Sequence, residues 1–219
     1  MDLWIYLLLT AAYAVILTAG IRRLTKLGWN HGSNFLLLVA FGLFYDNGLI
    51  AIGKWVGEGE SLKNLSYLRY WTHAFFTPTL ILVGLNILRR SHFKWASMTP
   101  AKATAWILTI GLVLYQIKVN TLEEVASLVP LREYGVLRYV AEAEGGGPVM
   151  VIIIATLLFV AGLLMAFKRR WIWMALGVAV LFVGRSLPMP IDSSALTNIY
   201  ELILIVSLWF TIRHLDREN

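Results

Sequence analysis

Cysteine is absent from this chain of 219 residues, and charged residues make up only 15% of it. Without cysteine the chain forms no disulfide, holds no metal through thiolates and uses no cysteine nucleophile. Hydrophobic residues reach 58%, whereas an ordinary soluble domain is about 45–50% apolar. Little charge and excess apolar content together predict a membrane protein.

Long apolar runs contain this excess. A transmembrane helix needs about 20 predominantly apolar residues. We therefore expect an all-α, polytopic membrane protein that forms a single domain over residues 1–219. The first run follows Asp2, where a signal peptide would have a basic segment, so we interpret it as a span. The seven expected transmembrane helices cover about 3–20, 35–53, 67–87, 103–119, 149–167, 171–186 and 196–212.

The connecting segments alternate between rich and poor in basic residues along the chain. Twelve of the 19 follow the first, third, fifth and seventh runs, where Asp216 and Glu218 are the only acidic residues. Because lysine and arginine stay on the cytoplasmic side, we expect the N-terminus outside the cell membrane and the C-terminus in the cytoplasm. The net charge of +6 does not predict nucleic-acid binding, because these residues flank apolar runs and can meet anionic lipid head groups.

Four strongly polar residues, Asp46, His73, Gln116 and Glu201, lie inside the apolar runs. With the expected orientation, each lies roughly 3–7 Å to the outer side of the membrane midplane, at 1.5 Å per helical residue. Lipid does not solvate a charge, so carboxylates at this depth predict a functional site. We expect the four to line a polar cavity that is open to the outside and closed toward the cytoplasm.

Helical spacing extends this set. Arg69, His73 and Thr77 recur every four residues and share one helix face. Asn198 and Glu201 are three residues apart, which also places them on one face. The expected catalytic residues are Asp46, Glu201 and His73. The expected substrate-binding residues are Asn47, Arg69, Tyr45, Thr77, Gln116, Arg185, Asn198 and Tyr200.

Two carboxyl groups in different surroundings can divide into a proton donor and an ionised partner. His73 could then accept or relay the proton. The alternative is architectural: the polar residues form hydrogen bonds between helices, and Asp46 pairs with Arg69 or Arg185. We expect no metal and no cofactor, because His73 is the only one of the four histidines inside a run.

Two other features bear on this cavity. Pro78 interrupts the third run, where the missing N–H is expected to kink the helix beside His73. The segment 120–148 is expected to form two short amphipathic helices, the second over 131–143, on the outer surface as a loop or lid over the cavity.

The stretch Phe44-Tyr45-Asp46-Asn47, followed by Gly57-Glu58-Gly59, Arg69, His73-Ala74 and Thr77-Pro78, resembles the signature of a family of small integral membrane proteins of unknown function. It covers about 40 residues, and no activity is carried over from it. In size, span number and membrane-embedded acids, the whole chain resembles the small seven-helix integral membrane terpene cyclases. That likeness implies acids that protonate an epoxide or alkene.

We therefore expect an integral membrane enzyme that acts on a lipid-like substrate, isoprenoid or acyl, by acid–base chemistry of a cyclase or isomerase type. Its partners would be membrane lipids and a hydrophobic small molecule. Two alternatives remain open at this stage: a small-solute or proton-coupled transporter, and a non-catalytic membrane receptor or scaffold. The oligomeric state is left open.

Overall fold

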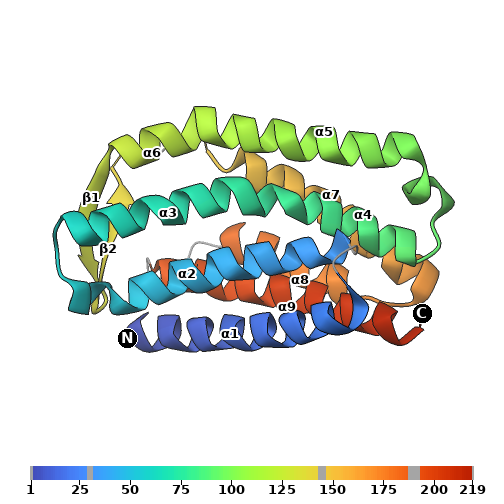
Figure 1. Ribbon diagram of the computed structural model, residues 1–219, viewed down its shortest axis with the longest axis horizontal. Helices are drawn as coiled ribbons and strands as arrows, with labels where there is room; N and C mark the ends of the chain where they lie inside the picture. Colours follow the sequence, from blue (N-terminus) through green and yellow to red (C-terminus); the bar gives the residue numbers. More distant parts are fainter. Residues whose placement is uncertain (1, 29–31, 143–146, 187–192, 219) are drawn as a thin grey trace.

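The computed structural model describes residues 2–28, 32–142, 147–186 and 193–218. Long helices run alongside one another, and a small two-stranded sheet lies at the end that holds the N-terminus, away from the C-terminus (Figure 1). Within the described residues, six helical segments are long and apolar enough to cross a membrane: 2–26, 32–56, 60–90, 99–126, 149–169 and 194–218. The chain is therefore a predominantly helical protein of the multi-pass membrane type.

The first half of the chain forms antiparallel helices. Pro78 has no N–H to continue the helix, and the third apolar run accordingly divides into two α-helices joined by a 3₁₀ turn. The expected interruption beside His73 is confirmed. The elements are α1 (Asp2–Leu27), η1 (Gly32–Asn34), α2 (Phe35–Val56), α3 (Glu60–Phe76), η2 (Thr77–Thr79) and α4 (Leu80–Arg90).

A 3₁₀ turn, η3 (Lys94–Ser97), leads into α5 (Thr99–Gln116). The helix then widens into a π-helical turn, η4 (Ile117–Thr121), before α6 (Leu122–Ala126). Such π turns occur frequently at functional sites. The antiparallel strands β1 (Leu128–Glu133) and β2 (Val136–Ala141) follow and form the small sheet.

This β-hairpin corrects the expectation of a second amphipathic helix over 131–143. The turn consists of Tyr134 and Gly135, with φ values of 46° and 88°, and such positive values suit a tight two-residue hairpin turn. The hairpin lies directly on α2: a Cβ atom added at Gly53 would be 2.0 Å from the carbonyl oxygen of Leu137. Only glycine allows this close approach.

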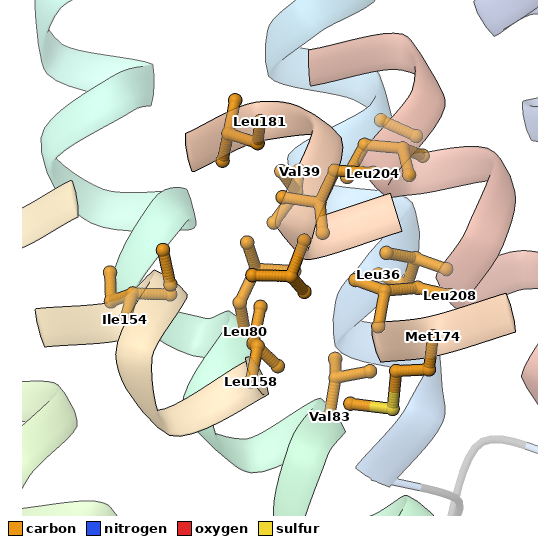
Figure 2. Close-up of a cluster of buried hydrophobic side chains, with 14 of the residues drawn as sticks. Leu36, Val39, Leu80, Val83, Ile154, Leu158, Met174, Leu181, Leu204 and Leu208 are labelled. Carbon is orange, nitrogen blue, oxygen red and sulfur yellow. The ribbon is translucent and has the colours of Figure 1, made fainter. Parts of the chain in front are cut away.

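The last three helices are α7 (Val149–Arg169), α8 (Trp173–Ser186) and α9 (Ser194–Glu218). The apolar part of α8, Trp173–Gly184, is shorter than the other candidate spans. Buried side chains from α2, α4, α7, α8 and α9 meet in the main core (Figure 2). Leu36, Val83, Leu158, Met174 and Leu208 are all at most 1% exposed there.

A cluster of charges ties the helices together at the C-terminal end. Asp216 on α9 accepts hydrogen bonds from Arg23 on α1 at 2.7 Å and forms an ion pair with Arg90 on α4 at 2.9 Å. The Asp216 side chain is only 8% exposed. Because each of its oxygens has a cationic partner, this buried carboxylate is compensated.

Candidate functional site

A cavity of about 520 Å³ lies between α2, α3, α7, α9 and the segment from α5 to β2. The four polar residues of the apolar runs, Asp46, His73, Gln116 and Glu201, all line it. Ligand-binding pockets have volumes of about 300–1,000 Å³, so the cavity is large enough for a small organic molecule. Arg69, Thr77 and Asn198 lie in the same wall.

The wall on α2 follows from helical periodicity. Val39, Gly42, Leu43 and Asp46 line the cavity and have the spacing i, i+3, i+4, i+7 of one helix face. Three of these residues are apolar or lack a side chain. The acid therefore stands at one end of an otherwise nonpolar surface.

Asp46 and Arg69 form an ion pair across α2 and α3, with 2.5 Å between Oδ1 and Nε. The second carboxylate oxygen, Oδ2, lies 3.4 Å from the amide nitrogen of Asn198 on α9. Arg69 also donates through Nη1 to the carbonyl oxygen of Tyr139 on β2, at 3.2 Å. Both oxygens of Asp46 are therefore engaged by neighbouring side chains.

His73 lies in the last turn of α3, and Thr77 is the first residue of the 3₁₀ turn η2 that follows. The hydroxyl of Thr77 lies 3.2 Å from Nδ1 of His73, within hydrogen-bonding distance. This contact steadies one ring nitrogen of His73. Both residues are half-buried, so the imidazole is shielded without being sealed from the cavity.

An apolar extension of about 50 Å³ continues from the cavity into the core. The residues that line both hollows are His73, Thr77, Glu201, Val39, Leu43 and Val151, so three polar and three apolar side chains lie where the hollows meet. Five residues of the extension wall, Val39, Leu80, Ile154, Leu181 and Leu204, are labelled in Figure 2. The larger cavity, which has polar and apolar walls, thus joins a narrow apolar hollow at a boundary that includes one histidine and one glutamate.

The π-helical turn after α5 provides the wall opposite α9. Gln116 accepts a hydrogen bond from the amide of Asn120 at 2.9 Å, and both side chains are buried. Glu124 lines the cavity as well. Sequence reasoning did not include Glu124 or Tyr70 among the site residues. The regular spacing of 116, 120 and 124 was the available signal for Glu124, whereas Tyr70 had only its position next to Arg69.

Four of the expected substrate-binding residues are not among the described residues that line the cavity. Tyr45 donates its hydroxyl hydrogen bond to the carbonyl oxygen of Leu65 and packs beside a second small core. It is rotated about 100° around α2 from Asp46, which directs it away from the cavity. Tyr200 packs against α8, where its ring would be 2.5 Å from a Cβ added at Gly184.

Asn47 is fully buried behind the cavity wall, where its Oδ1 accepts from Asn198 at 2.9 Å. The side chain of Arg185 lies outside the described residues. Asn47, Tyr45 and Tyr200 are therefore not among the described residues that line the cavity.

Within the described residues, no group of three or more His, Cys, Asp or Glu side chains has an arrangement that could hold a metal ion. The chemistry available in this cavity is that of two carboxyl groups, Glu124 and Glu201, together with an imidazole, amides and a guanidinium–carboxylate pair. In comparisons with known proteins, no protein-family model and no curated protein matches this chain.

Proposed function

We propose that the protein is an integral enzyme of the cell membrane that acts on a lipid-like substrate, isoprenoid or acyl, by acid–base chemistry. The observation that carries the proposal is the junction of the polar cavity with the apolar extension at His73 and Glu201. A molecule with an apolar chain and one reactive polar or unsaturated group fits such a junction. Its chain would occupy the extension, and its reactive group would lie between the two side chains.

We infer seven transmembrane helices, of which α8 is the short sixth, and a cavity in the outer half of the membrane. The cluster of Arg23, Arg90 and Asp216 lies at the C-terminal end, and the hairpin whose Ala141 lines the cavity lies at the other end (Figure 1). Retention of basic residues on the cytoplasmic side supports an extracytoplasmic N-terminus and hairpin.

In the proposed reaction, the carboxyl group of Glu201 donates its proton to an alkene carbon or an epoxide oxygen of the substrate. In an alkene the π electron pair takes up the proton and leaves a carbocation at the other carbon. In an epoxide a lone pair of the oxygen takes up the proton, and the C–O bond then breaks with its electrons passing to oxygen, which leaves a hydroxyl group and a carbocation. Loss of a proton from a neighbouring carbon to His73 produces a new double bond, and the proton returns from His73 to Glu201. Atoms and electrons balance, so the reaction is an isomerisation or cyclisation without a redox partner.

The remaining polar residues position the substrate. Arg69 and Asp46 hold each other across α2 and α3, and Gln116 and Asn198 present amide groups to the same space. Phe76 lines the cavity, whereas its neighbour Phe75 stacks on Trp71 with ring centroids 5.8 Å apart. An aromatic face can stabilise a nearby cation by roughly 0.5–2 kcal/mol, so Phe76 and Tyr70 would carry that role.

Transport is the alternative function, and it requires a polar path from the cavity to the cytoplasm. Below the extension, Leu36, Val83 and Met174 are fully buried in the core, and Asp216 is held by arginines beyond them. This apolar packing favours an enzyme or a receptor over a transporter.

The test combines retained lipids with turnover. Purified protein is incubated with a lipid extract of its own membranes, and changes in chromatographic retention and in the number of double bonds are followed by mass spectrometry. Glu201→Gln should lower turnover by roughly 100-fold or more, the usual contribution of a general acid, and should retain unreacted substrate. Glu123→Gln on the exposed face of α6 is the matched control.

An unchanged lipid profile with wild-type protein, together with identical retained lipids in both variants, would contradict an enzymatic function. Reconstituted vesicles test the alternative, because proton or solute flux that depends on Glu201 would establish transport instead.

A further inference from the structure

A second, smaller cavity of about 150 Å³ lies between η1, α4 and α5. It is lined by Gly32, Phe35, Leu82, Leu85, Asn86, Arg89, Lys102 and Trp106. None of these residues borders the large cavity. The two hollows are thus separate, and this one contains two cationic side chains and no acid among its described lining residues.

We propose that this second cavity binds the phosphate group of an anionic phospholipid. Lys102 and Trp106 are four residues apart on α5, and Asn86 and Arg89 are three apart on α4, so each helix directs one cation and one neighbouring side chain into the same space. Phosphate binding by clustered lysine and arginine between transmembrane helices is a known mode of lipid recognition.

Both cations are available for a ligand. The neighbouring Arg90 forms an ion pair with Asp216. Arg89 and Lys102, by contrast, form no ion pair within the part of the chain that the structure describes. A phosphate group between them would gain charge-assisted hydrogen bonds from both side chains.

Asn86 supplies a third donor. Its side chain is 5% exposed, and its Oδ1 is buried without a hydrogen-bond partner among the described residues. The amide nitrogen faces Gly32, because a Cβ added at Gly32 would lie 3.3 Å from Nδ2. The absence of a side chain at Gly32 therefore leaves the amide N–H₂ group turned toward the cavity. The Nδ2 group can donate to a phosphate oxygen, whereas the unpaired Oδ1 is an acceptor that a phosphate does not satisfy.

The surroundings of the cavity indicate that a phospholipid, and not a soluble compound, supplies the phosphate group. The cavity has room for about five water molecules at roughly 30 Å³ each, enough for a phosphate group but not for an acyl chain. Outside it, α5 exposes Ile107, Ile110 and Leu114, which are 70%, 54% and 62% exposed. The acyl chains of a phospholipid can lie along this apolar surface while its phosphate enters the cavity beside Trp106.

The test measures lipid binding to delipidated protein by native mass spectrometry, with phosphatidylglycerol and with zwitterionic phosphatidylcholine as probes. Wild-type protein should prefer phosphatidylglycerol. Arg89→Gln and Lys102→Gln should each weaken this binding by about tenfold, the effect of losing one charge-assisted hydrogen bond. Arg22→Gln and Lys94→Gln remove exposed basic residues that do not line the cavity, and they should leave binding unchanged.

A further arm distinguishes the source of the phosphate. Inorganic phosphate and glycerol 3-phosphate are added to the same protein in neutral detergent, and thermal stability is recorded. We expect little stabilisation, because these anions lack the chains that contact α5. Stabilisation that is lost in Arg89→Gln and Lys102→Gln would assign the site to a soluble phosphate compound and overturn the lipid proposal.

Gly32→Ala tests the site without changing charge, because its methyl group would cover the amide of Asn86. Weaker phosphatidylglycerol binding in a variant that melts like the wild type supports the proposal. Equal binding of both lipids, or equal losses in the control and cavity variants, refutes it.

Discussion

Arg69 on α3 joins the wall of the large cavity to the hairpin that closes one end of the molecule. Its Nε lies 2.5 Å from Oδ1 of Asp46, and its Nη1 donates to the carbonyl oxygen of Tyr139 on β2 at 3.2 Å. The Arg69 and Asp46 side chains are 11% and 23% exposed. A single guanidinium therefore couples the position of α2 to that of the hairpin.

Asp46→Asn should lower the free energy of unfolding by roughly 3 kcal/mol, because it leaves Arg69 largely buried without its anion. Unfolding in detergent, followed by circular dichroism, measures the loss. Glu58→Gln is the control, since its ion pair with Arg132 is between side chains that are 46% and 66% exposed and should be worth less than about 1 kcal/mol. Equal losses in the two variants would contradict the importance of burial.

Gly53→Ala should displace the hairpin, because the new methyl group would overlap the carbonyl oxygen of Leu137. We expect faster proteolysis at the exposed turn formed by Tyr134 and Gly135 in this variant. Gly111→Ala on α5 is a matched substitution with no atom within 4 Å of the added carbon. If both variants are cleaved at the wild-type rate, the close contact between α2 and β2 is wrong.

Asp216→Asn should also destabilise the protein by roughly 3 kcal/mol, since it removes the anion shared by Arg23 and Arg90. Glu218→Gln provides the comparison. Its carboxylate pairs with Arg169 at 2.6 Å but is 37% exposed, so the loss should be below about 1 kcal/mol. Chemical unfolding of the two variants in the same detergent gives the difference, and a smaller loss for Asp216→Asn would count against the buried cluster.

Single cysteines test the orientation, because the natural chain contains none. Ser61→Cys at the start of α3 and Ser97→Cys in η3 place exposed thiols near opposite ends of the segment 60–90. A membrane-impermeant maleimide should label Ser61→Cys in intact cells and Ser97→Cys only after lysis. The reverse pattern would place the N-terminus in the cytoplasm.

The positions of the helices could be predicted from the sequence because they depend on local composition. Every expected apolar run falls on helical segments, as α7 (Val149–Arg169) does with the run at 149–167, although the third run is divided at Pro78. The hairpin could not be predicted from the sequence, because the spacing of Leu128, Leu131 and Val136 is compatible with a helix as well as with a strand. In addition, Tyr-Gly is not among the residue pairs preferred in type I′ hairpin turns. Its register depends on contacts with α2 that no local pattern contains.

The site residues, too, could be predicted from the sequence only in part. A polar residue inside an apolar run had to face protein or water, so Asp46, His73, Gln116 and Glu201 were identifiable one by one. Tyr45 and Tyr200 do not line the described cavity, because the face that a helix turns toward a cavity depends on its neighbours. The partners of Asp46 are 23 residues away at Arg69 and 152 residues away at Asn198.

Membrane class, helix positions and the candidate acids thus follow from the order of residues, since exclusion of charge from lipid acts on each short segment independently. The convergence of these acids on one cavity, the engagement of Asp46 by Arg69 and the boundary at His73 and Glu201 arise only when helices distant in the chain pack together. Packing depends on the shapes of facing side chains over long sequence separations, and this information is absent from any local window of residues.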